Sequence, residues 1–251
     1  MNNTLYIVVP CYNEEEALPQ TAPQFREKLR ALTGQGLVSS DSRILLVDDG
    51  SKDRTWEIIS ALHEADTAFD GVRLDRNRGH QNAVMAGLVT AIQYADATIT
   101  IDADLQDDID AIDEMVKKYL AGAQIVCGVR SNRDSDSFLK RFTAQGYYAL
   151  MNLFGAKLIY NHADFRLLSR EAVNKLCCFG TDDLFLRGLI TRLGYTPEKV
   201  CYARLPRTAG ESKYTVKKML KLAAKGFSCG RQRPAAQPQI GDLCIGEVLH
   251  G

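Results

Sequence analysis

The chain has 251 residues, of which 45% are hydrophobic and 25% are charged, a composition typical of globular proteins with one large domain or two small ones. Its 31 basic and 31 acidic side chains give a formal net charge of zero, so we expect no nucleic-acid partner. The seven cysteines form no CxxC pair and the four histidines follow no zinc spacing, which favours a cytoplasmic protein with reduced thiols. No apolar run reaches the roughly 18 residues of a transmembrane segment, and the start of the chain leaves no room for a targeting peptide.

Short apolar runs and amphipathic helical patterns alternate through the first half of the chain. The predicted strands cover 5–9, 43–47, 72–74, 98–101 and 124–129. Apolar residues at helical spacing follow each of the first four runs. This alternation predicts an α/β fold with a mostly parallel central sheet flanked by helices. Polar residues follow the strands, and the carboxyl ends of such strands form the expected ligand crevice.

The second half of the chain is predicted to be more mixed. After a polar segment at 131–137, we predict a helix over 138–158, a strand over 164–168, helices over 170–178 and 182–193, and a strand over 200–205. A basic amphipathic helix is predicted over 214–227, within a segment (204–233) that holds nine Lys or Arg and one acidic residue. This helix is a candidate for lying on an anionic membrane surface; the alternative is a solvated face packed on the domain. Residues 228–251 are predicted to be irregular.

The run at 98–101 ends in two carboxylates, Asp102 and Asp104. Residues two apart in a strand point to the same side, so these side chains are predicted to converge at the edge of the sheet. Carboxylates without neighbouring Cys or His suit a hard cation, Mg²⁺ or Mn²⁺, which takes substrate phosphates as further ligands. The alternative is an acidic turn that simply ends the strand.

A series of motifs in this chain resembles glycosyltransferase family 2, and within it the polyprenyl-phosphate sugar transferases. The motifs are VVPCYNE at 8–14, VDDGS at 47–51, NRG at 77–79 with Ala83, DADLQ at 102–106, GVR at 128–130, KR at 140–141, DFRL at 164–167 and RTAGESKY at 207–214. Each motif alone is weak evidence, but the ordered set covers residues 5–227. The resemblance implies one GT-A-type nucleotide-diphospho-sugar transferase domain over 1–227, with a nucleotide-binding half of about 1–130 and an acceptor half of about 131–227.

The resemblance also implies a role for each matching residue. Donor base and ribose would be held by Pro10, Tyr12, Glu14 and Asp49, with Asp102 and Ala103 near the ribose and the metal. The metal ligands would be Asp104, Asp102 and Gln106, and the donor phosphates would be reached by Arg130, Arg207 and Lys213. Asp164 matches an acidic residue that lies near the sugar and the acceptor. The residues expected to act in catalysis are Asp164, Asp104 and Arg130.

The implied reaction is an inverting transfer of a sugar from a nucleoside diphosphate to a polyprenyl phosphate. UDP-glucose is the favoured donor, because the region around Lys140 and Arg141 is more similar to bacterial glucosyltransferases; GDP-mannose and UDP-N-acetylglucosamine remain open. A lipid phosphate is largely anionic near neutral pH, so we expect Asp164 to position the acceptor rather than to deprotonate it. The protein would lie at the inner face of the cytoplasmic membrane through 214–227, and a homo-oligomer is a further expectation.

Several alternatives stay open at this point. The family usually continues from the basic segment into hydrophobic helices, whereas this chain continues into a polar segment, so a non-catalytic nucleotide-sugar-binding remnant or a partner subunit is the main alternative. A dinucleotide oxidoreductase would need GxGxxG after the first strand, and a polysaccharide-directed transferase would need a stronger base. Residues 12–14 could simply begin a helix, Arg130 and Arg207 could form surface ion pairs, and Asp164 could be structural. His80 and His162 are interpreted as packing or hydrogen-bonding residues.

Overall fold

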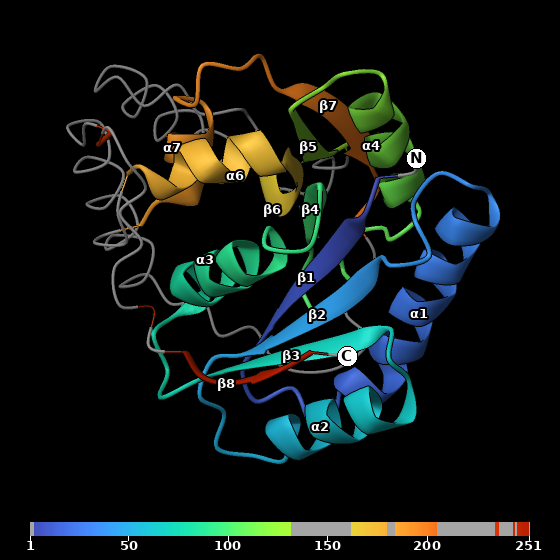
Figure 1. The fold of residues 1–251 in the computed structure, drawn as a ribbon, viewed down its shortest axis with the longest axis vertical. Helices are drawn as coiled ribbons and strands as arrows, with labels where there is room; N and C mark the ends of the chain where they lie inside the picture. The colour runs from blue at the N-terminus through green and yellow to red at the C-terminus, as the bar shows by residue number, and fades with distance from the viewer. Residues whose placement is uncertain are drawn as a thin grey trace, which may run out of the picture.

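The computed structural model describes residues 3–131, 162–179, 184–204, 234–235, 243 and 245–250 (Figure 1). The predicted helix over 138–158, the predicted phosphate-binding residues Arg207 and Lys213, and the basic helix over 214–227 lie outside the described residues. Among the helices that are described, none combines the length and the apolar character needed to cross a bilayer.

One sheet contains every strand of the described residues, in the order β7-β5-β6-β4-β1-β2-β3-β8. The strands are β1 (Leu5–Cys11), β2 (Arg43–Asp48), β3 (Phe69–Leu74), β4 (Ala97–Thr100), β5 (Ile125–Arg130), β6 (His162–Ser169), β7 (Glu198–Tyr202) and β8 (Ile245–Leu249). The pairs β1–β2, β1–β4, β2–β3 and β5–β7 are parallel. Strand β6 is antiparallel to both β4 and β5, and β8 is antiparallel to β3. The predicted α/β fold with a mostly parallel sheet is confirmed.

Helices cover both faces of the sheet (Figure 1). They are α1 (Leu18–Gly34), α2 (Thr55–Ala65), α3 (His80–Ala91), α4 (Ala111–Leu120), α6 (Arg170–Cys177) and α7 (Leu186–Ile190). Alternate side chains of β1 enter two different cores: Tyr6 and Val8 join the core with α3, α6 and α7, whereas Leu5, Ile7 and Val9 join the core with α1, α2 and α4. Burial on both faces explains why the strand is a continuous apolar run.

Helix α3 packs closely against the sheet at Gly87, which faces β1 and β2. A Cβ atom at Gly87 would lie 2.4 Å from Cγ1 of Val8 and 2.8 Å from Cγ2 of Val47. Only glycine permits this approach, which is one of the reasons for a glycine in the middle of a helix. The close packing fixes the position of the first residue of α3, His80, at the carboxyl end of the strands.

Part of the segment that was predicted to be irregular forms a strand. In β8, Val248 lies opposite Val72 and Glu247 opposite Arg73. Beyond the strand, Nδ1 of His250 lies 2.8 Å from Oδ2 of the buried Asp70. The prediction for 228–251 is therefore wrong for residues 245–249. Four of the five β8 residues are exposed, so the strand is held by backbone pairing and leaves no apolar periodicity in the sequence.

Gly50 is expected to be essential for stability, because its φ of 62° lies in the left-handed region and a Cβ atom would lie 2.4 Å from the carbonyl carbon of Arg76. We predict that Gly50→Ala lowers the free energy of unfolding by about 1–3 kcal/mol, measured by urea denaturation. The control is Gly34→Ala, since a Cβ atom there meets nothing within 4 Å. The control should not lower the free energy of unfolding and should raise it by at most about 1 kcal/mol, because Ala is favoured over Gly in a helix; an equal loss in the two variants would contradict the explanation.

Candidate active site

The loops that follow β1 and β2 are joined by side-chain hydrogen bonds. Asn13 has a φ of 52°, its backbone N–H donates to Oγ of Ser51 over 2.9 Å, and its Oδ1 accepts from the N–H of Lys52 over 2.9 Å. The N–H of Glu14 donates to Oγ1 of Thr55 over 2.8 Å. Among the predicted base- and ribose-binding residues, Pro10 lies within β1. Tyr12 and Glu14 are partly exposed and lie in the loop after β1, whose backbone is fixed by these hydrogen bonds.

Asp49, the fourth residue of that predicted set, faces the loop before α3. Its side chain is buried, Oδ1 accepts from the N–H of Arg78 over 2.6 Å, and Oδ2 accepts from the N–H of Gly79 over 2.9 Å. Burial raises the pKa of Asp49, and the two backbone N–H groups oppose this. In this structure Asp49 thus holds the turn that leads into α3, and its contact with a donor nucleotide stays a prediction.

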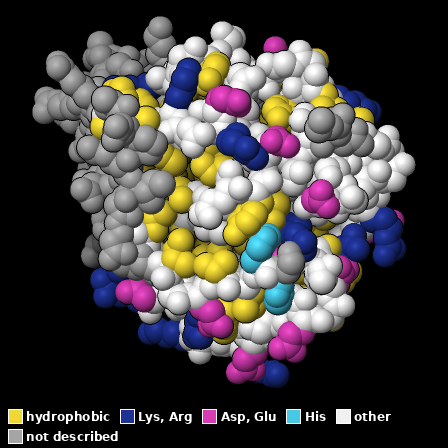
Figure 2. Space-filling view, viewed as in Figure 1, with side chains coloured by type: hydrophobic (Ala, Val, Ile, Leu, Met, Phe, Trp, Pro, Cys, Tyr) yellow, Lys and Arg dark blue, Asp and Glu magenta, His cyan; other side chains and the backbone are white. Residues whose placement is uncertain are grey.

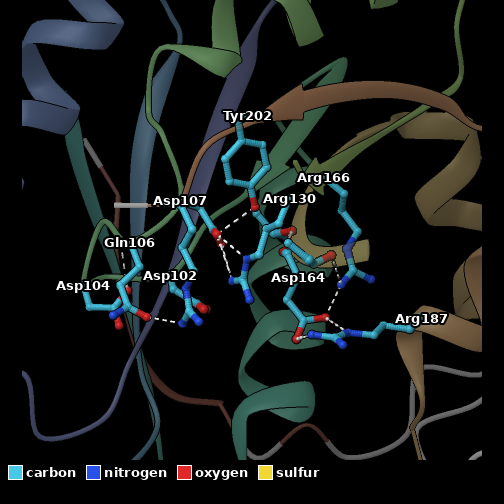
Figure 3. A network of polar contacts seen from close by, with 12 residues as sticks. Asp102, Asp104, Gln106, Asp107, Arg130, Asp164, Arg166, Arg187 and Tyr202 are labelled. Atoms are coloured by element: carbon cyan, nitrogen blue, oxygen red, sulfur yellow. Dashed lines mark hydrogen bonds and ion pairs between the residues drawn. The ribbon is translucent and has the colours of Figure 1, made fainter. Parts of the chain in front are cut away.

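The two acidic residues of the DADLQ motif lie in a loop, because β4 ends at Thr100. The predicted geometry of neighbouring strand positions is therefore wrong for Asp102 and Asp104. Both side chains are nevertheless partly exposed, while those of Ala103 and Leu105 are buried in the core. Leu105 has a φ of 45°, which turns the chain sharply within this motif. Figure 3 shows Asp102, Asp104 and Gln106 as neighbours at this turn.

Gln106 and Arg130 are both engaged by other side chains (Figure 3). Oε1 of Gln106 accepts from Arg204, so metal ligation by this oxygen would require the contact to break. Arg130 donates to both oxygens of the buried Asp107, over 2.9 and 3.1 Å, and the hydroxyl of Tyr202 donates to the same carboxylate over 2.7 Å. Although burial lowers the pKa of Arg130, Asp107 outweighs it and raises that pKa. The roles of Gln106 and Arg130 toward a donor stay predictions.

Asp164, on β6, accepts from two guanidinium groups. Arg187 donates to its two oxygens over 3.2 and 3.1 Å, and Arg166 donates to Oδ1. Arg166 is only 1% exposed, and its Nε and Nη1 atoms are buried without a hydrogen-bond partner. Burial favours a higher pKa for Asp164, but Arg187, Arg166 and His80 together hold that pKa well below its usual range. Asp164 is therefore a stable carboxylate and a weak base.

His80 has a more central position than the sequence suggested. Its Nε2 lies 3.8 Å from Oδ1 of Asp102 and 3.8 Å from Oδ2 of Asp164, and 41% of its side chain is exposed. His80 was interpreted as a packing or hydrogen-bonding residue; the structure places its imidazole between the two acidic groups of the site, and any role toward a ligand stays a prediction. In the sequence, the signal for His80 was its position directly after Gly79. In the structure, Gly79 has a φ of 89° and precedes helix α3, which begins with His80 at the carboxyl ends of the strands.

The donor atoms at the DADLQ turn fit a hard divalent cation. Although 41% of the side chain of Asp102 is exposed, the surrounding protein atoms desolvate its carboxylate and raise its pKa, as do the nearby carboxylates of Asp164, Asp107 and Asp104, while His80 lowers it. A cation between Asp102 and Asp104 would relieve this repulsion, and Mg²⁺ commonly uses one or two carboxylates together with water and phosphate. Within the described ranges, no group of three or more His, Cys, Asp or Glu residues is arranged to hold a metal, so further ligands would have to come from substrate or water.

Sequence comparison places the chain among glycosyltransferases. The family model for glycosyl transferase family 2 matches residues 6–177. The uncharacterized glycosyltransferase YkoT of Bacillus subtilis is 47% identical over 224 residues, which cover 89% of this chain and 66% of that protein. The bactoprenol glucosyl transferase of Shigella phage SfV is 38% identical over 226 residues, which cover 88% of this chain and 70% of that protein. The chain thus spans about two thirds of the length of these relatives.

Solved structures with the same fold are more distant in sequence. Glucosyl-3-phosphoglycerate synthase from Mycobacterium tuberculosis, in complex with Mg²⁺ and UDP, has a TM-score of 0.62 at 16% identity, covering 90% of this chain and 78% of that one. The complex of that enzyme with Mn²⁺, UDP-glucose and phosphoglyceric acid has a TM-score of 0.58 at 15% identity, covering 99% and 89% of the two chains. This likeness concerns the GT-A-like fold, and the family match with the closer relatives shows that the chain belongs to glycosyltransferase family 2.

Proposed function

We propose that this protein is a metal-dependent, inverting glycosyltransferase that moves a sugar from a nucleoside diphosphate, with UDP-glucose as the favoured donor, to a polyprenyl phosphate. The observation that carries the proposal is the pairing of Asp164 with Arg166 and Arg187 beside the carboxylates of Asp102 and Asp104. The carboxylates of Asp102 and Asp104 suit a cation bound to a diphosphate. The group formed by Asp164, Arg166 and Arg187 has a net positive charge and no strong base, which suits an acceptor that is already anionic.

The donor side of the proposal rests on the partly exposed pair Asp102 and Asp104. These carboxylates would hold Mg²⁺ or Mn²⁺, which, when bound, neutralises charge that develops on the departing diphosphate. Tyr12 and Glu14, in the rigid loop after β1, would contact the base and ribose. Arg207 and Lys213, outside the described residues, complete the proposed set of phosphate contacts. The complexes of the Mycobacterium tuberculosis enzyme with Mg²⁺ and UDP support this arrangement at the level of the fold.

The acceptor side follows from the weak basicity of Asp164. A sugar hydroxyl must lose a proton during the transfer, and a general base of suitable pKa then contributes about 10²–10⁴ to the rate. The pKa of Asp164 is held too low for that role by Arg187 and Arg166, which act against the effect of burial. A phosphate monoester, with a second pKa of about 6, is mostly a dianion near neutral pH and attacks without losing a proton. The bactoprenol relative at 38% identity supports a lipid phosphate.

The proposed step is a direct displacement at the anomeric carbon. An oxygen of the acceptor phosphate forms a bond to this carbon while the bond to the donor diphosphate breaks and its electron pair leaves with the diphosphate. Attack from the side opposite the leaving group inverts the configuration. The basic segment 214–227 would hold the protein at the inner face of the membrane, where a polyprenyl phosphate presents its headgroup.

A donor screen tests the proposal directly. The full chain would be incubated with polyprenyl phosphate in detergent, Mg²⁺ or Mn²⁺, and radiolabelled UDP-glucose, GDP-mannose or UDP-N-acetylglucosamine. We expect labelled lipid from UDP-glucose and none after chelation of the metal. Donor binding without any lipid product would instead favour the remnant or partner-subunit alternative.

We predict that Asp104→Asn weakens Mn²⁺ binding in the presence of UDP and lowers transfer by at least about a hundredfold, since loss of a ligand should cost at least as much as loss of a supporting residue. Mn²⁺ binding would be measured by electron paramagnetic resonance, independently of activity. The matched control is Asp108→Asn in the same acidic run, where Oδ1 of Asp108 accepts from the N–H of Asp110 over 3.0 Å. Similar Mn²⁺ affinities for the two variants would argue against Asp104 as a ligand.

Asp164→Asn separates positioning from base catalysis. Because Asp164 is expected to position the acceptor, we predict that the variant loses less than about tenfold in kcat, well below the 10²–10⁴ that a general base contributes. The rate would be corrected for the folded fraction, measured by circular dichroism, because Arg166 is buried and loses part of its counter-charge. A loss of several orders of magnitude with UDP binding intact would identify Asp164 as a base.

A further inference from the structure

We propose that Arg187 and His80 form the subsite that receives the phosphate of the acceptor beside Asp164. This assignment deepens the proposed function and rests on it. Neither residue belongs to the motifs that suggested the donor site. Both approach Oδ2 of Asp164 within the described structure: Nη2 of Arg187 lies at 3.1 Å and Nε2 of His80 at 3.8 Å.

Exposure distinguishes the two guanidinium groups that pair with Asp164. Arg166 is 1% exposed and Asp164 is 11% exposed, so this pair is covered by protein. The side chains of Arg187 and His80 keep 31% and 41% of their surface exposed. The buried Arg166 therefore balances the charge of Asp164 from within. Arg187 and His80 are thus two positively charged or polar contacts of Asp164 that also reach solvent.

The two side chains are held next to each other by a contact between their helices. Oε1 of Gln81, directly after His80 in α3, accepts from the N–H of Leu186, directly before Arg187 in α7, over 3.1 Å. Gln81 thereby joins the start of α3 to the start of α7. Because Gly87 fixes α3 closely against β1 and β2, this hydrogen bond ties the start of α7 to a helix that packs tightly on the sheet. A preorganised pair loses little entropy when it binds an anion.

The anion could in principle be a phosphate of the donor or the phosphate of the acceptor. Figure 3 shows Asp102, Asp164 and Arg187 in this order across the site, with Arg187 on the far side of Asp164 from Asp102. The donor diphosphate belongs with the cation at Asp102 and Asp104. A phosphate beside Arg187 would therefore be that of the acceptor, and a guanidinium is well suited to bind phosphate oxygens through charge-assisted hydrogen bonds.

The experiment compares acceptor and donor binding in Arg187→Gln and His80→Gln. Farnesyl phosphate would be titrated into the full chain loaded with UDP and Mn²⁺, using isothermal titration calorimetry, and the acceptor KM would be measured with polyprenyl phosphate. We expect each variant to weaken farnesyl phosphate binding and raise the acceptor KM about 10- to 100-fold, the scale of a lost hydrogen bond between charged groups. In Arg187→Gln the affinity for UDP with Mn²⁺ should change less than about twofold, which a general loss of structure would not produce; His80 also lies 3.8 Å from Asp102, so this comparison is made with the Arg187 variant alone.

Two further variants guard against misfolding. Arg192→Gln, five positions beyond Arg187, removes a guanidinium that lies 5.3 Å from the ring of Phe179 and should leave farnesyl phosphate binding unchanged. Arg187→Lys keeps the charge and should recover part of the affinity. Thermal melting of all variants would show whether they are folded.

The outcomes separate the subsite from the function. Normal acceptor KM in Arg187→Gln, or weakened UDP binding with normal farnesyl phosphate binding, would overturn the subsite and leave the transferase function standing. If the wild-type protein binds farnesyl phosphate through Arg187 but transfers no sugar, the function fails and the subsite stands. If the wild-type protein does not bind farnesyl phosphate, the subsite is overturned as well.

Discussion

The ion pairs between Asp164 and the guanidinium groups of Arg166 and Arg187 set the charge of the whole site. A guanidinium as deeply buried as that of Arg166 is costly unless a carboxylate lies beside it, and Asp164 provides that partner. The same pairing lowers the pKa of Asp164 and so favours its ionised form. This charge balance is the basis of the proposal that the acceptor arrives with its own negative charge. The carboxylates of Asp102 and Asp104 lie beside these ion pairs. The site therefore has an acidic part, formed by Asp102 and Asp104, and a basic part, formed by Arg166 and Arg187 around Asp164.

The antiparallel direction of β6 makes this arrangement possible. Because β6 runs against β4, its first residues lie at the same edge of the sheet as the last residues of β1, β2 and β4. Oγ1 of Thr100, the last residue of β4, donates to the carbonyl oxygen of Asp164 over 2.8 Å. The loop that carries Asp102 thus begins beside Asp164. An all-parallel sheet would have placed the start of this strand at the opposite edge.

The sequence allowed the central strands and the fold class to be predicted, because strands buried on both faces are continuous apolar runs and each is followed by a helical pattern. It could not show the direction or the place of β6, which depend on pairing between distant segments. It missed Asp107 as the partner of Arg130 and Tyr202, although an acidic residue directly after DADLQ was visible. It also missed His80, whose position between two carboxylates depends on the turn at Gly79 and on the packing of α3.

The surface shown in Figure 2 has acidic and basic side chains interspersed among hydrophobic ones, in keeping with a formal net charge of zero. A net charge of zero is compatible with strong local differences in electrostatic potential, such as those around Asp102, Asp104 and the ion pairs of Asp164. A single substitution in that region changes the local potential strongly while the net charge of the protein changes by one or two. Isoelectric point and overall charge are accordingly poor guides to the ligand of this protein.

Strand β8 has a consequence for the order in which the sheet is assembled. It pairs residue 247 with residue 73, so this edge has a very high contact order compared with the pairs β1–β2 and β2–β3. Closing such a long loop gains little until the rest of the sheet is in place. The edge formed by β3 is thus left without its partner during most of folding, and for a chain emerging from the ribosome this strand is open to mispairing until residues 245–249 have been synthesised.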